Sequence, residues 1–209
     1  ARLINRLQAV HRVFRTTALA FTLVLPLLAA ASSSRLPVLP EAIRLVRAEA
    51  PLAFEVNRGQ THSSVQYLVR TSNFTFFLTN TELVAAASGA GFRMKLEGCD
   101  PGQSWMGESK LAGVTNYLTG RDAGKWITGV SNYAVLRRRV YPGIDMVLRG
   151  GRRRLEYRFE IAAHADPALL RFSFRDAEPS LSPNGDLVLH TPKGDFRHKA
   201  PAAYQIVSG

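Results

Sequence analysis

The sequence predicts an all-β protein: an antiparallel β-sandwich or open barrel, preceded by a signal-peptide helix and a short linker helix. Three observations predict this class. Apolar residues recur at every second position in run after run beyond residue 51, which is the period of strands with one buried face. Turn-forming dipeptides separate the runs. The links are also too short for the crossovers that parallel strands require.

The first segment, residues 1–34, has the parts of a secretory signal peptide and its flank. A basic stretch precedes an uncharged apolar run from Thr16 to Ala31, and small residues favour cleavage between Ala31 and Ser32. An uncleaved anchor is the alternative, but this run is shorter than the roughly 20 residues that cross a bilayer. We expect a Sec-type signal and an extracytoplasmic protein, secreted or at the cell surface. The basic residues are Arg2, Arg6, Arg12 and Arg15.

Residues 35–50 are expected to form a linker, with a helix of about two turns between Pro40 and Pro51. The β-sandwich domain is expected over residues 51–209. Because the chain opens with Ala1 and stops at Gly209 directly after an apparent strand, we expect a fragment of a longer protein. The domain is then incomplete at its C-terminus.

The expected strands each place one apolar face toward a core, and we expect about eight to ten of them. The charged residues between the apolar ones point the other way, as Arg93, Lys95 and Glu97 do in one run. The inward sets are Val65, Tyr67 and Val69; Phe74, Phe76 and Leu78; Phe92, Met94 and Leu96; Ile144, Met146 and Leu148; Leu155, Tyr157, Phe159 and Ile161; and Leu170, Phe172 and Phe174.

The turns between these strands have specific chemistry. Pro101-Gly102 and Pro142-Gly143 suit type II turns, in which Pro sets φ and Gly accepts a positive φ. Asn184-Gly185 and Gly150-Gly151 suit tight hairpins, and the second predicts that Ile144–Arg149 pairs with Arg152–Tyr157. The stretch Tyr133–Tyr141 breaks the pattern, because Tyr133 and Val135 fall on the same face of the expected strand as Arg137 and Arg139. This break predicts either a register-shifting bulge or an exposed basic strand.

Composition excludes several classes of protein. The 209 residues are 46% apolar, which is too apolar for a disordered chain, and the one Cys cannot form an internal disulfide. The formal charge is +11, and without residues 1–34 the chain keeps 23 basic and 16 acidic residues, a charge of +7. We expect no cofactor and no metal site. The charge favours anionic partners, whereas the export signal argues against nucleic acid.

An ordered series of motifs resembles a known family. The resemblance is to the uncharacterised N-terminal domain of large exported bacterial proteins that carry SBBP β-propeller repeats downstream. It covers residues 51–207 and implies an extracytoplasmic β-rich module with the propeller of the same chain as its partner; it implies no active site. His164-Ala165 stands where the family usually has Pro-Gly. The motifs are Leu52–Gln60, Asn116–Gly120 with Trp126, Tyr141–Asp145, Leu155–Tyr157, Ala165–Pro167, and Gly185–Leu189 with Pro201 and Tyr204-Gln205.

Two of these motifs contain polar groups that suggest binding loops, but turn chemistry explains both. In Asn57-Arg58-Gly59-Gln60 the amide side chains can mimic backbone hydrogen bonds. In Tyr141-Pro142-Gly143-Ile144-Asp145 a Pro-Gly turn is expected, with Asp145 capping nearby amides. We interpret Asn57, Gly59, Gln60, Tyr141, Pro142, Gly143 and Asp145 as structural residues.

Two charged groupings are the remaining candidates. Arg137, Arg139, Arg152 and Arg154 lie on either side of the expected hairpin; they either form an anion-binding patch or keep an edge strand soluble. Carboxylates among Glu55, Asp145 and Glu156 offer an alternative function as a carbohydrate-active hydrolase, since such enzymes pair two carboxyl groups.

The function that we expect is non-enzymatic. The chain is expected to serve as an exported structural or binding module of the cell envelope or extracellular space, N-terminal to a β-propeller repeat region. It would contact anionic cell-envelope glycans, and it would contact the membrane only through the signal segment.

Overall fold

The prediction of an all-β antiparallel fold is confirmed. The computed structural model describes residues 19–24, 51–87, 89–151, 154–192 and 194–205, and over these ranges the chain forms fifteen strands and two short 3-10 helices. The strands are β1 (Leu19–Val24), β2 (Phe54–Val56), β3 (Tyr67–Arg70), β4 (Thr75–Leu78), β5 (Glu82–Ala87), β6 (Ala90–Leu96), β7 (Met106–Tyr117), β8 (Ile127–Tyr141), β9 (Ile144–Gly150), β10 (Leu155–Ile161), β11 (Phe172–Arg175), β12 (Glu178–Leu181), β13 (Leu187–Thr191), β14 (Gly194–His198) and β15 (Ala202–Gln205). The helices are η2 (Ala123–Lys125) and η3 (Pro167–Leu169).

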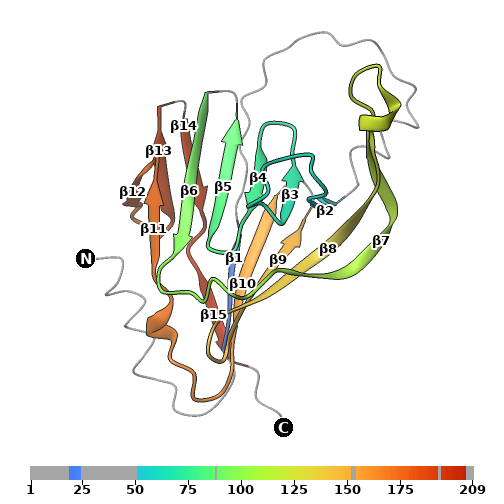
Figure 1. Ribbon diagram of the computed structural model, residues 1–209. Helices are drawn as coiled ribbons and strands as arrows, with labels where there is room; N and C mark the ends of the chain where they lie inside the picture. The colour runs from blue at the N-terminus through green and yellow to red at the C-terminus, as the bar shows by residue number, and fades with distance from the viewer. Residues whose placement is uncertain (1–18, 25–50, 88, 152–153, 193, 206–209) are drawn as a thin grey trace, which may run out of the picture.

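The strands form one large curled sheet and one small sheet. The large sheet has the order β11-β6-β5-β4-β3-β2-β8-β9-β10-β1-β15, with β7 on the other edge of β8, and the small sheet has the order β12-β13-β14. The large sheet curls into a half-barrel around the long, bent strand β8, and β7 and β8 project away from the body as a hairpin (Figure 1). More strands occur than the eight to ten expected, and one of the additional strands is β1, which lies where a helix was expected.

The core lies between the two wings of the half-barrel and the small sheet. Every second residue is buried in β10 and, from Phe92 onward, in β6, and their charged neighbours are more exposed, so the predicted inward faces of these strands are confirmed. Phe196 of β14 contacts Phe74 and Phe92 at ring-centroid distances of 4.8 Å. The small sheet therefore closes the apolar interior.

Strand β8 resolves the conflict at Tyr133–Tyr141. Its fully buried side chains here are Leu136, Arg138 and Val140, so an arginine belongs to the core face. Tyr133, Val135, Arg137 and Arg139 lie on the opposite face, and the β7–β8 register does not shift between Tyr133 and Arg137, so the exposed strand and not a bulge explains their shared parity. A register shift of the β8–β9 ladder does occur, but it falls between Arg139 and Tyr141, beyond the arginines.

The β9–β10 hairpin differs from the prediction. Gly150 pairs with Leu155, so the loop holds four residues instead of the expected two. Gly150 is still required, because a Cβ at this position would overlap the carbonyl oxygen of Leu52, where the chain runs toward β2. The residue type at position 150 is therefore constrained by a tertiary contact as well as by the hairpin. The hairpin register moves Glu156 opposite Arg149 and Glu160 opposite Asp145.

The N-terminal apolar run also differs from expectation over its described part. Leu19–Val24 is not the expected helix; it forms β1, which pairs with β10 on one side and with β15 on the other. In a short, continuously apolar run, periodicity cannot distinguish a helix from a buried strand. As a strand, the backbone N–H and C=O groups of β1 bond to those of β10 and β15. The predicted cleavage site and the linker helix over 35–50 lie outside the described residues. In the part of the chain that the structure describes, no helix has the length and apolar character needed to cross a bilayer.

Candidate functional site

The outward side chains of β8, β9 and β10 form a charged face on which arginines and carboxylates alternate. Arg137 lies at its centre: its Nε donates to Glu108 at 2.6 Å, and its Nη1 donates to Glu160 at 2.6 Å and to Asp145 at 3.3 Å. The bonds to Glu160 and Glu108 raise the pKa of Arg137. We call the following residues the β8–β10 charged face: Arg137, Arg139, Asp145, Arg149, Glu156, Arg158 and Glu160.

Glu160 is the carboxylate of this face whose pKa is lowered. Partial burial acts to raise the pKa of Glu160, but hydrogen bonds from Arg137 and Arg158 outweigh burial and lower it. A catalytic acid needs the opposite arrangement, in which the environment raises the pKa of a carboxyl group toward neutrality. Glu160 is therefore an anion that holds Arg137 and Arg158 in place.

The residues of the predicted arginine patch are distributed differently from the prediction. Arg137 and Arg139 lie on the charged face, and Asp145 contacts both, at 3.3 Å and 3.6 Å. Arg154 lies beyond the opposite end of the hairpin and pairs with Glu156 at 2.9 Å. Arg152 lies outside the described residues. The described arginines therefore do not gather, and each is neutralised by a carboxylate.

The carboxylates proposed for hydrolysis are also separated. In the observed register Asp145 faces Glu160 rather than Glu156, and the Nη1 of Arg137 bonds to both Asp145 and Glu160. Glu55 lies on β2, away from this pair. The residues predicted from sequence therefore do not converge on one site, because the four-residue loop displaces Glu156 along the sheet.

A second cluster joins two motifs that are far apart in the sequence. Glu55 of β2 is only 7% exposed. Its Oε2 accepts a hydrogen bond from the hydroxyl of Tyr117 on β7, and its Oε1 lies 3.6 Å from the Nε of Arg70 on β3. The guanidinium of Arg70 also covers the Tyr117 ring, 5.3 Å from its centroid. Burial, together with the bond to Glu55, raises the pKa of Tyr117. A tyrosine held protonated in this way acts as a donor rather than as a nucleophile.

Replacement of Tyr117 by Phe should lower the free energy of unfolding by about 1–2 kcal/mol, because a buried carboxylate loses its hydroxyl donor while the ring remains on Arg70. Urea denaturation of the wild type and the variant measures the change. Tyr204→Phe is the control, since Tyr204 is 49% exposed. Equal midpoints for Tyr117→Phe and the wild type would show that the bond does not contribute to stability.

The Asn57–Gln60 motif holds its own loop. The Asn57 side chain donates to the carbonyls of His62 at 2.9 Å and Val65 at 2.8 Å, and it accepts from the N–H of Gly59. Gln60 donates to the carbonyl of Val56 at 2.6 Å. Gly59 has a φ of +105°, a conformation that favours glycine. These contacts connect β2 to β3 and leave the amide groups occupied within the loop.

The Tyr141–Asp145 motif forms the tight turn between β8 and β9. Gly143 has a φ of +72°, as a Pro-Gly turn requires. The Tyr141 hydroxyl donates to the carbonyl of Glu97 at 2.7 Å, and burial raises the pKa of Tyr141 to about 12. Asp145 does not cap the turn amides as expected; it binds Arg137 and Arg139 on the charged face.

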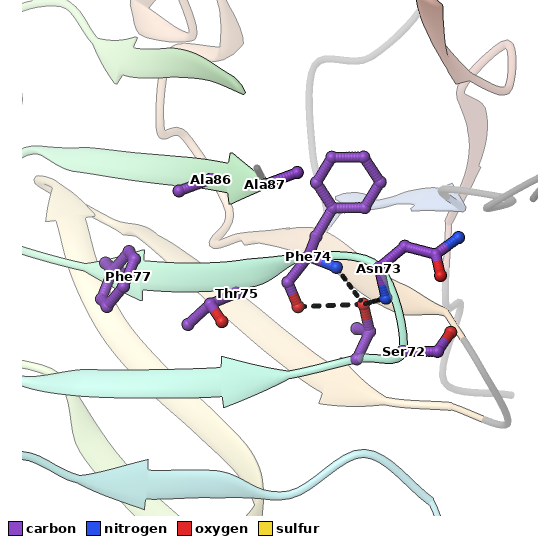
Figure 2. A pocket seen from close by; sticks show the side chains of 8 residues that line it. Ser72, Asn73, Phe74, Thr75, Phe77, Ala86 and Ala87 are labelled. Carbon is purple, nitrogen blue, oxygen red and sulfur yellow. Dashed lines mark hydrogen bonds between the residues drawn. The ribbon is translucent and has the colours of Figure 1, made fainter. Parts of the chain in front are cut away.

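A shallow pocket of about 340 Å³ lies where β3 turns into β4, beside the end of β5 (Figure 2). The turn supplies polar side chains, whereas Phe77, Ala86 and Ala87 supply apolar surface. The sequence pattern does not indicate this pocket, because its residues belong to ordinary strand and turn patterns. It also misses Arg138 and the meeting of Glu55 with Tyr117, which depends on the register of strands far apart in the chain.

Fold and site together define an all-β antiparallel domain whose charged groups are arranged as ion pairs on its sheets. The chain belongs to a family of domains of unknown function, DUF7948, whose sequence model matches residues 54–209. The matched range begins at β2 and includes both motif loops and the charged face. No curated protein and no solved structure matches the chain.

Proposed function

We propose that this chain is an exported, non-enzymatic structural or binding module of the cell envelope or extracellular space. One observation supports this proposal above the others: each carboxylate considered for hydrolysis is engaged by an arginine at a different place. Glu55 contacts Arg70, Asp145 contacts Arg137, and Glu156 contacts Arg154. Glycoside hydrolysis needs two carboxyl groups about 5–10 Å apart across one substrate. The ion pairs instead suit a rigid scaffold.

We further propose that the module stands N-terminal to a β-propeller of the same full-length chain, as in the SBBP-repeat proteins that its motifs resemble. Anionic glycans of the envelope are the proposed ligands, attracted by the charge of +7 that remains without residues 1–34. Because carboxylates neutralise Arg137, Arg139 and Arg154, this attraction comes from the charge of the whole domain more than from one patch.

Binding to heparin, a soluble anionic glycan, tests the proposal. Affinity should fall steeply as NaCl is raised from low to physiological concentration, because salt screens exposed charges. The double variant Arg139→Gln/Arg154→Gln should weaken binding no more than the control Arg58→Gln/Arg121→Gln, which removes the same charge elsewhere. We expect about a two- to fivefold loss for either pair.

Three outcomes would contradict parts of the proposal. Affinity that is independent of salt would exclude attraction by charge. A much larger loss for the Arg139/Arg154 pair would restore the arginine patch. Hydrolysis of a glycan by the wild type that is abolished in Glu55→Gln, Asp145→Asn or Glu156→Gln would establish the hydrolase and exclude a non-enzymatic module.

A further inference from the structure

We propose that the pocket between the β3–β4 turn and the end of β5 binds a neutral pyranose unit of a polysaccharide. The inference deepens the proposed binding function, on which it rests, by naming a site and a class of ligand. It does not depend on the arginines, since no charged side chain lines the pocket. Its volume of about 340 Å³ lies at the small end of ligand sites, which suits one or two sugar rings.

The turn that forms one wall is held by its own hydrogen bonds. The Thr71 hydroxyl accepts from the N–H of Asn73 at 3.3 Å and from that of Phe74 at 2.9 Å, and it donates to the Phe74 carbonyl at 3.0 Å; Figure 2 draws these bonds as dashed lines. The backbone of the turn is therefore fixed without the side chains of Ser72 and Asn73.

Those side chains are available to a ligand. Ser72 and Asn73 are exposed, and neither they nor Thr75 form a side-chain hydrogen bond with any other described residue. Together they provide two hydroxyls and one amide, groups that both donate and accept. Sugar hydroxyls need this combination, because each also donates and accepts. Since the turn is already ordered, binding costs little backbone entropy.

Phe74, Phe77, Ala86 and Ala87 supply the apolar part of the site, and Phe77 is the ring that does not belong to the core cluster. Phe77 lies opposite Leu68 and Val84 in the sheet, and it makes no ring contact with another aromatic residue in the described part of the chain. Phe74, by contrast, packs against Phe196 in the core at 4.8 Å. Ala86 lies opposite Thr75 and adds little bulk beside the ring. An aromatic ring with open space next to it is the surface on which the C–H face of a pyranose packs.

The neighbouring charge explains why a neutral sugar fits best. Arg70 lies opposite Thr75 in the sheet, but its guanidinium donates to Tyr117 at 3.1 Å and pairs with Glu55 at 3.6 Å. Its charge is therefore committed to the β2 side of the sheet, away from the pocket. The carboxylate of an acidic sugar would find no cation to pair with here. The ligand is therefore recognised through its hydroxyl groups and its C–H face.

Titration of the isotope-labelled chain with chitotriose, a neutral oligomer of N-acetylglucosamine, and with maltotriose tests the site by NMR. At least one of these probes should shift the amide signals of residues 71–77 and 86–87, with a Kd in the millimolar range typical of a shallow site. Phe77→Ala should weaken binding by about tenfold or more, and Asn73→Ala by about three- to tenfold. Trigalacturonate should bind no more tightly than the neutral probes. Tyr204→Ala, which removes an exposed aromatic residue of β15, should change nothing.

If Phe77→Ala unfolds the domain, Ala86→Leu serves as the test instead. Ala86 is partly exposed and lines the pocket, so a larger side chain there fills the pocket without removing an existing contact. It should abolish the shifts. Absence of shifts with both neutral probes, or equal binding by the wild type and Ala86→Leu, overturns the site. Heparin binding that persists in Ala86→Leu leaves the proposed function standing, so the two failures are distinguishable.

Discussion

Replacement of Arg138 by Leu is expected to lower the free energy of unfolding by about 3 kcal/mol, because the carbonyl groups of Gln103 and Asp100 lose a buried, charged donor. Arg138 is 1% exposed. Its Nε donates to the Gln103 carbonyl at 2.9 Å, and its Nη2 donates to that of Asp100 at 2.5 Å. The guanidinium also lies 5.9 Å from the centroid of the Trp105 ring. It thus ties the β6–β7 connection to the core face of β8.

The adjacent arginine provides the matched control. Arg139 is 68% exposed at its side chain and forms an ion pair with Asp145, at 3.6 Å, so Arg139→Leu should change stability by less than about 1 kcal/mol. Arg138→Lys should fall between the two, because an ammonium can reach one carbonyl but not both. Urea denaturation gives the three values. A loss at Arg138→Leu no larger than that at Arg139→Leu would show that the buried guanidinium is dispensable.

The second large effect is expected on acidification, through His198. This side chain is 1% exposed, and its Nε2 has no hydrogen-bond partner among the described residues. The Tyr157 hydroxyl lies 3.4 Å from its Nδ1, and the ring of Phe92 packs nearby at a centroid distance of 6.1 Å. Burial lowers the pKa of His198 to about 4. The folded protein therefore holds this imidazole neutral.

The direction of the pH effect follows from this lowered pKa. Between pH 6.5 and 4 the unfolded chain binds the proton and the folded chain does not, so stability falls as the pH falls. From pH 7 to pH 5 the loss should be about 2 kcal/mol. Carboxylates with lowered pKa values add their own losses mainly below this window; they are Glu97, Asp100, Glu160 and Asp186.

Urea denaturation at pH 7 and pH 5 measures the effect. His198→Phe should remove most of the difference between the two midpoints, because the ring environment remains and the titrating group is lost. His190→Gln is the control, since His190 is exposed and lies on the other face of the small sheet. The same pH dependence in the wild type and in His198→Phe would exclude His198 as its source.

Some features of this fold can be predicted from the sequence alone, because they follow from local chemistry. The inward sets of β6 and β10 follow from alternation, since side chains point to opposite faces at every residue. The turns at Gly143 and Gly185 follow from the need for positive φ, which both glycines show. The polar loop at Asn57 follows from the ability of amide side chains to replace backbone partners. Each of these features depends on neighbours within a few residues.

Features that depend on residues far apart in the sequence could not be predicted in this way. The register of β9 and β10 decides whether Asp145 meets Glu156 or Glu160, and Gly150 at one end of this ladder lies against Leu52, far away in the chain. The inward position of Arg138 requires carbonyl groups of the β6–β7 connection to lie beneath it. Glu55 meets Tyr117 only because β2 and β7 both flank β8.

By itself, the sequence determined that this chain folds into antiparallel strands with a defined inner face, because alternation and turn geometry act locally. Only the tertiary structure decided which charges neutralise one another, which arginine enters the core and where a pocket opens. The physical reason is that ion pairs and cavities arise between segments far apart in the chain, and their positions depend on strand register, which no local pattern encodes.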